Sequence, residues 1–98
     1  MNLTVTAIIA KLRENMPILT EKYRVKTLGL FGSYVRGQQK RSSDIDVLVE
    51  FYETIDLFTF VELEEFLGGI LGHKVDLVMK DTLKPRIREK ILNEALPV

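Results

Sequence analysis

Apolar residues in the first part of the chain recur with the period of one helix face. They are Leu3, Ile8, Ile9, Leu12 and Met16, a spacing that places them on one side of a helix. Pro17 does not fit comfortably inside a helix, because its ring clashes with a carbonyl one turn back. We therefore expect a helix from residue 3 to about residue 15, and a second, short helical piece from Pro17 to about residue 23.

A further helix is predicted over residues 57–71, where apolar residues again follow the helical period. Asp56 directly precedes it and is a suitable N-cap. Gly68 and Gly69 lie inside this stretch, and each costs on the order of 1 kcal/mol relative to alanine. We therefore expect the end of this helix to be frayed or kinked.

The last helix is expected to begin after Asp81 or Thr82 and to run to about residue 95. Pro85 would lie in its first turn, where the missing N–H of proline does no harm. Its predicted buried stripe consists of Leu83, Ile87, Ile91 and Ala95.

Three short runs between these helices predict strands, at residues 25–31, 44–51 and 74–79. The short link between the first two favours an antiparallel pair, and the helical crossover to the third favours a parallel neighbour. The order of elements predicts an α/β (α+β) fold, in which a small mixed three-stranded sheet packs with helices. A length of 98 residues fits one domain, taken as residues 1–98.

Composition narrows the classes of function. Fourteen Lys and Arg balance 14 Asp and Glu, so the net charge of zero gives no general attraction for DNA or an anionic membrane. Cysteine is absent, which excludes disulfides and thiolate metal sites and fits a cytoplasmic protein. We find neither a secretory signal pattern nor an apolar stretch long enough to span a bilayer.

The second predicted strand carries the first candidate chemistry. Asp44 and Asp46 are two residues apart, so their side chains share one face, roughly 6.6 Å apart along the strand. Carboxylates at this spacing can converge on Mg²⁺, which prefers oxygen ligands and is often completed by phosphate oxygens. The alternative is that both are surface residues of a half-exposed strand, although aspartate is a poor strand former and like charges repel.

The third predicted strand adds Asp76 between Val75 and Leu77. If this strand neighbours the second one, Asp76 would lie beside Asp44 and Asp46, because adjacent strands are about 4.8 Å apart. Three carboxylates holding two metal ions form the clamp used in phosphoryl and nucleotidyl transfer. The alternative is an edge-strand residue that points to water.

The segment GSYVRG follows the first predicted strand. Gly32 allows the backbone to approach a phosphate closely, and Ser33 offers a hydroxyl and an N–H group. Arg36 offers a planar fork for a phosphate or a carboxylate. The alternative is an ordinary turn bounded by glycines. Lys40 and Arg41, in the loop that follows, fit a solvated loop better than a triphosphate contact.

The string GSYVRG, then SSDIDVLVE, then KVDLV resembles the nucleotidyltransferase signature G-S-x-x-x-G…D-x-D…D. It is most similar to the minimal nucleotidyltransferase proteins, the antitoxin half of HEPN–MNT toxin–antitoxin pairs, and the resemblance covers nearly the whole chain. Val35 stands where many members carry alanine, and the Gly68–Gly69 pair interrupts a helix that is usually a better helix former.

The resemblance implies the α/β core of the DNA polymerase β superfamily. It implies that Gly32 and Ser33 hold the triphosphate of ATP, and that Asp44, Asp46 and Asp76 are the catalytic residues and ligands of two Mg²⁺ ions. The implied function is that of an antitoxin in a type VII-like pair. It would transfer AMP from Mg-ATP to a tyrosine hydroxyl of a HEPN ribonuclease toxin and so neutralise it.

Two other functions stay open at this point. One is an antitoxin that blocks its toxin by binding alone, and the other is transfer to a small-molecule hydroxyl, against which the short chain argues. Neutral charge and the lack of a basic, aromatic face argue against a nucleic-acid substrate. The assembly, as a homo-oligomer or a hetero-oligomer, is also open. His73, the only histidine, is expected to be a surface or capping residue and not a catalytic base.

Overall fold

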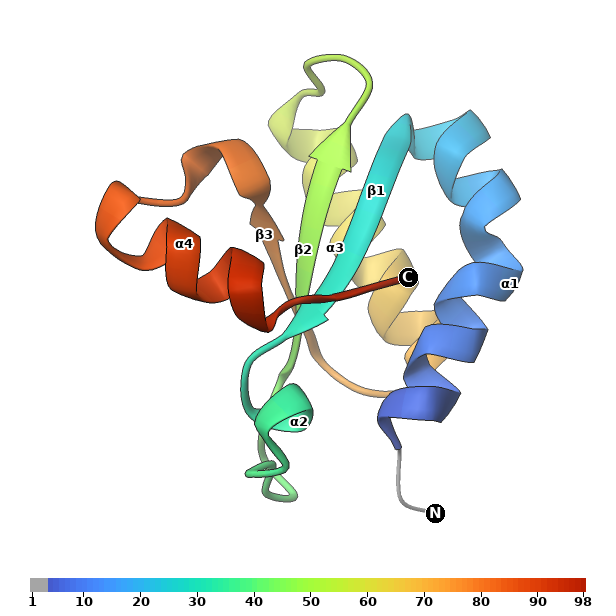
Figure 1. Cartoon of the computed structure of the whole chain (residues 1–98). Coiled ribbons are helices and arrows are strands. Elements are labelled where there is room, and N and C mark those ends of the chain that lie inside the picture. The colour runs from blue at the N-terminus through green and yellow to red at the C-terminus, as the bar shows by residue number, and fades with distance from the viewer. Residues whose placement is uncertain (1–3) are drawn as a thin grey trace.

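A mixed β-sheet with helices packed against it forms the frame of the protein (Figure 1). The computed structural model describes residues 4–98, so the predicted helix start at Leu3 lies outside the described residues. The elements in chain order are α1 (Val5–Tyr23), β1 (Val25–Phe31), α2 (Ser33–Arg36), β2 (Ile45–Phe51), α3 (Leu57–Leu71), β3 (Val75–Met79), a 3₁₀ turn η1 (Lys80–Thr82), α4 (Pro85–Glu94) and β4 (Leu96–Pro97).

The sheet has the strand order β3-β2-β1-β4. The antiparallel pairing of β1 with β2 and the parallel pairing of β2 with β3 confirm the predictions. The prediction of three strands was wrong, because β4 pairs with β1 through Leu96 opposite Leu30 and Pro97 opposite Gly29. A strand of two residues shows no alternation in sequence. Its proline is tolerated because β4 lies at the edge of the sheet.

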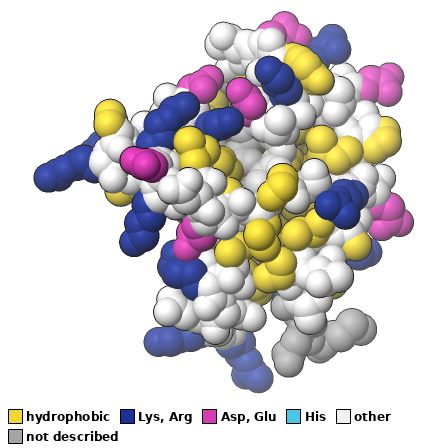
Figure 2. Space-filling model, viewed as in Figure 1, with side chains coloured by type: hydrophobic (Ala, Val, Ile, Leu, Met, Phe, Trp, Pro, Cys, Tyr) yellow, Lys and Arg dark blue, Asp and Glu magenta, His cyan; other side chains and the backbone are white. Residues whose placement is uncertain are grey.

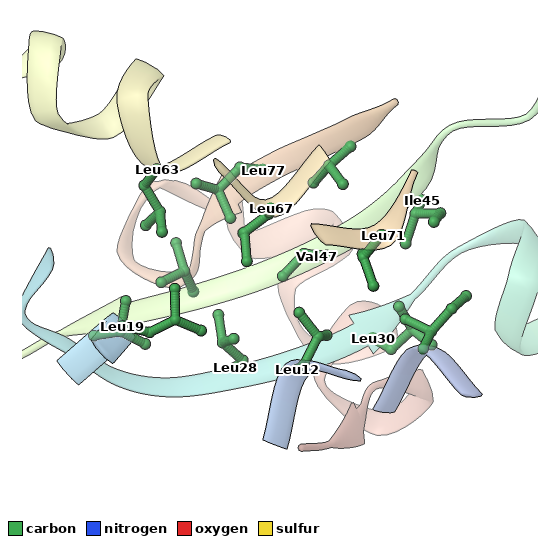
Figure 3. Packing of buried hydrophobic residues seen from close by; sticks show 14 of the residues in the cluster. Leu12, Leu19, Leu28, Leu30, Ile45, Val47, Leu63, Leu67, Leu71 and Leu77 are labelled. Atoms are coloured by element: carbon green, nitrogen blue, oxygen red, sulfur yellow. The ribbon is translucent and has the colours of Figure 1, made fainter. Parts of the chain in front are cut away.

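The hydrophobic core lies between one face of the sheet and the two long helices α1 and α3 (Figure 3). The side chains of Leu30, Ile45 and Val47 are fully buried against these helices. Burying a side chain of this size contributes roughly 1.5–3 kcal/mol relative to exposing it. The two long helices contribute Ile8, Leu12, Leu19 and Tyr23 from α1 and Leu63, Leu67 and Leu71 from α3 to this core.

Helix α1 runs without a break from Val5 to Tyr23, so the predicted division at Pro17 was wrong. An interior proline costs about 3 kcal/mol. Leu12 and Leu19, on either side of Pro17, are both fully buried, and together they offset that cost at roughly 1.5–3 kcal/mol each. Tertiary packing therefore keeps the two halves in one helix.

Helix α3 begins as predicted, because the Asp56 side chain accepts a hydrogen bond of 2.7 Å from the Thr59 N–H. The expected fraying at Gly68 and Gly69 was wrong, since the helix continues to Leu71 and ends at Gly72 with a φ of 64°. A Cβ atom on Gly68 would lie 3.2 Å from the His73 carbonyl oxygen. This glycine therefore lets the turn after the helix close against it.

Helix α4 runs from Pro85 to Glu94, with Pro85 in its first turn as predicted, but it begins later than the predicted start after Asp81 or Thr82, because residues Lys80–Thr82 form the separate turn η1. The predicted buried stripe was wrong, because Ile87 is 46% exposed and Leu83, Ile91 and Ala95 are only partly buried. The reason is that α4 does not join the core between the sheet and the two long helices, and no residue of α4 is fully buried. Over residues 4–98, none of the helices combines the length and apolar character needed to cross a membrane.

Candidate active site

Strand β2 presents alternate residues to two different environments. Its Val47 pairs with Leu30 of β1 and Leu77 of β3, and these apolar neighbours belong to the buried cluster. We call this the core face. Asp46 pairs with Phe31 and Asp76 on the opposite side, which we call the carboxylate face.

Asp46 and Asp76 are direct neighbours across the parallel β2–β3 pair. Asp44 precedes β2 by one residue and lies two positions before Asp46. Asp76 is exposed on an edge strand, as one sequence alternative had it, yet it also lies on the same face as Asp46. The register therefore brings Asp46 and Asp76 together on one face, and Asp44 lies just before this end of β2.

The aspartates influence one another electrostatically. Burial raises the pKa of Asp46 from its ordinary value of 3.8 to about 6, and the carboxylates of Asp76 and Asp44 act in the same direction. Arg36 acts in the opposite direction on this pKa. Asp44 also lies 3.9 Å from the ammonium group of Lys74. Repulsion of this kind is relieved when a cation binds between the carboxylates.

The donor set fits Mg²⁺, a hard cation that takes carboxylate and phosphate oxygens. Among residues 4–98, no three acidic, histidine or cysteine side chains are already gathered into a preformed metal-binding group. Asp46 and Asp76 still lie close enough to influence each other, because Asp76 acts on the pKa of Asp46 through both its charge and a side-chain hydrogen bond. The strand register fixes the backbone positions of Asp46 and Asp76 for a metal site.

The turn between β1 and α2 lies directly against Asp46. Gly32 has a φ of 82°, a conformation that favours glycine. A Cβ atom at this position would lie only 2.0 Å from Oδ2 of Asp46. Ser33 follows as the first residue of α2 and is partly exposed. The structure therefore places the Gly32–Ser33 turn beside the carboxylate face, and phosphate binding by these residues stays a prediction.

Arg36 is engaged by Glu94, a residue that the sequence analysis did not single out. The Arg36 Nη1 donates to Oε1 of Glu94 at 2.9 Å, and the Gly32 N–H donates to Oε2 of the same carboxylate at 3.1 Å. Although burial acts to raise it, the pKa of Glu94 is lowered, because these two donors stabilise its charged form. In the structure Arg36 therefore pairs with a carboxylate, which is one of its two predicted roles. Phosphate binding by Arg36 stays a prediction.

Basic side chains project at the end of the molecule where the α2–β2 connection lies (Figures 1 and 2). Lys40 and Arg41 of this connection are both exposed. The loop is therefore solvated, as the sequence favours.

Comparisons with known proteins give the family of the chain. The family model described as "Nucleotidyltransferase domain" matches residues 12–98. The chain belongs to this family. The protein adenylyltransferase MntA of Thermococcus cleftensis is 46% identical over 96 residues, which cover 98% of this chain and 97% of the relative. The predicted resemblance to nucleotidyltransferases is therefore confirmed.

Solved structures confirm the fold. A protein assigned as a minimal nucleotidyltransferase superposes with a TM-score of 0.81 and 35% identity, covering 99% of this chain and 98% of its own. The MNT antitoxin complex with a tri-AMPylated HEPN toxin from Shewanella oneidensis contains a chain with a TM-score of 0.60 and 27% identity. That match covers 94% of this chain and 66% of the other. The chain is thus an enzyme of the nucleotidyltransferase class, with protein adenylyltransferases among its relatives.

Proposed function

We propose that the protein is an antitoxin that transfers AMP from Mg-ATP to a tyrosine hydroxyl of a HEPN ribonuclease toxin and thereby neutralises it. The observation that carries this proposal is the pairing of Asp46 with Asp76 beside the Gly32 turn. The AMPylated HEPN toxin in the Shewanella complex supports the choice of acceptor class.

Each site residue has a role in this proposal. Asp44, Asp46 and Asp76 would hold two Mg²⁺ ions, and the bound ions supply charge neutralisation and acidify the acceptor hydroxyl. The Gly32–Ser33 turn would hold the triphosphate through N–H groups and the serine hydroxyl. If Gly32 is to offer its N–H to a phosphate, the hydrogen bond from this group to Glu94 has to open.

The reaction is an in-line displacement at the α-phosphorus. A bond forms between the acceptor oxygen and this phosphorus, while the bond to the bridging oxygen of the β-phosphate breaks. Pyrophosphate leaves with the electron pair of that bond. Asp76, which is exposed beside Asp46, would activate the acceptor hydroxyl and take up the proton that this hydroxyl loses. Positioning and charge stabilisation supply most of the rate in such transfers.

The test is transfer of label from α-labelled ATP to the partner toxin in the presence of Mg²⁺. Wild-type protein and the control Asp81→Asn, an exposed aspartate outside the site, are expected to label the toxin. Asp44→Asn and Asp46→Asn are expected to lose at least about 10²-fold in rate, the effect of removing one charge-stabilising group. Full activity of both variants would reject the metal assignment.

The same variants separate catalysis from binding. If Asp46→Asn still inhibits the ribonuclease when mixed one to one with it, occlusion suffices and the antitoxin works without chemistry. If inhibition is lost together with label transfer, AMP transfer is the neutralising event.

A further inference from the structure

His73 contacts separate segments of the candidate site, although the sequence predicts no catalytic or binding role for it. It lies in the turn between α3 and β3, and is partly buried. Its Nε2 atom contacts the backbone carbonyl oxygen of Ser43 and lies 3.3 Å from the Tyr34 hydroxyl. Its ring also meets the Tyr34 ring edge-on, with the centroids 6.0 Å apart.

These contacts reach every segment that carries a candidate site residue. Tyr34 directly follows Ser33, Ser43 directly precedes Asp44, and His73 lies three positions before Asp76. One side chain therefore connects the proposed phosphate turn, the start of the Asp-x-Asp strand and the strand of the third aspartate.

The contact with Ser43 lies where the exposed connection of residues 37–42 returns to the sheet. Ser43 closes a turn there, because its N–H donates to the Lys40 carbonyl and its hydroxyl accepts from the Lys40 N–H. Beyond this point, the Ile45 N–H donates to the Lys74 carbonyl and the β2–β3 ladder begins. Asp46 is thus held by the ladder, whereas Asp44 lies outside it and depends on the segment that His73 holds.

Hydrogen-bond chemistry fixes how His73 acts. A backbone carbonyl only accepts, so Nε2 carries the proton and donates to Ser43. Glutamine carries an NH₂ group at the end of a side chain of similar reach and can donate in the same way. Alanine removes the donor. The backbone hydrogen bond from the N–H of residue 73 to the Gly68 carbonyl does not depend on the side chain, so histidine, glutamine and alanine can all form it.

We propose that His73 is a positioning residue that holds Asp44 and the Gly32–Ser33 turn in register with Asp76. It touches neither nucleotide nor acceptor and acts through Ser43 and Tyr34. The catalytic part of this inference rests on the proposed function, whereas the ordering of the connection does not.

The first measurement is hydrogen–deuterium exchange of the nucleotide-free protein over residues 38–44. His73→Ala is expected to exchange faster there than wild type, and His73→Gln is expected to restore slow exchange. Tyr34→Phe, which removes only the hydroxyl, is expected to have the smaller effect. Exchange that is unchanged in His73→Ala, or not restored by glutamine, would overturn the proposal.

The second measurement is the steady-state rate of AMP transfer at varied ATP and Mg²⁺. We expect His73→Ala to lower kcat roughly tenfold, because a slightly misplaced group costs up to about 10²-fold, and to require more Mg²⁺. The KM for ATP is expected to change less, and His73→Gln is expected to recover most of the rate. The positioning role would be overturned if His73→Gln did not recover the rate of AMP transfer. It would also be overturned if the loss of rate in the variants simply followed their loss of melting temperature. If wild type and Asp81→Asn transfer no AMP, the proposed function fails. The exchange experiment would still show whether His73 orders the connection through its contact with Ser43.

Discussion

The two faces of the sheet differ in what they contribute. On the core face, Leu30, Val47 and Leu77 lie side by side and pack beneath α1 and α3. On the carboxylate face, Asp46 and Asp76 occupy the corresponding places one residue along, and their charges repel. Strand β2 belongs to both faces because successive side chains alternate. The buried face therefore offsets the instability of the face that carries the site.

The largest expected effect comes from the core face. Leu30→Ala is expected to lower the free energy of unfolding by about 2–5 kcal/mol, because Leu30 is fully buried. Leu57→Ala is the matched control, since Leu57 is 73% exposed and surface changes usually stay within about 0.5 kcal/mol. Urea denaturation measures both. Equal losses would contradict the assignment of stability to the core face.

A glycine substitution probes the border of the carboxylate face. Gly32→Ala is expected to cost about 1–3 kcal/mol, from strain at positive φ, and to displace the Asp46 side chain that its Cβ would strike. The rate of AMP transfer should fall in the same variant. The control is Gly69→Ala, at an open helical position, which should be neutral or stabilise by up to about 1 kcal/mol. If Gly32→Ala were as stable as wild type and transferred AMP at the same rate, the inferred close contact between this turn and Asp46 would be contradicted.

A smaller effect is expected from pH. Burial first, then the carboxylates of Asp76 and Asp44, raise the folded-state pKa of Asp46 from 3.8 to about 6. The folded protein therefore binds this proton more tightly than the unfolded chain. The stabilisation from protonation is complete below pH 3.8 and is lost as the pH rises through about 6. The melting temperature of metal-free wild type, relative to Asp46→Asn, should fall across this window. A constant or rising difference would contradict the burial and repulsion that raise the pKa of Asp46.

Local patterns predicted most of the frame. The strands β1, β2 and β3 and the Asp56 cap follow from neighbouring residues, so the sequence places them correctly. The unbroken helix through Pro17 was missed because its stability comes from packing against distant residues. Strand β4 was missed because only its pairing with β1 defines it.

The same distinction holds in the site. Asp44, Asp46 and Asp76 stand out because aspartate is unusual in a strand. Glu94 and His73 carry no such signal. Glu94 meets Gly32 across 62 positions, and His73 meets Ser43 across 30. Contacts of this kind depend on the folded topology and have no periodicity that a sequence could display.

The most direct test of the central claim is calorimetric titration of the protein with AMP-PNP in the presence of Mg²⁺. If the carboxylate face is the metal–nucleotide site, wild type and Asp81→Asn should bind the complex. Asp46→Asn should bind it at least about tenfold more weakly, a difference of about 1.4 kcal/mol, while melting no lower than wild type. Equal binding by Asp46→Asn would contradict the account.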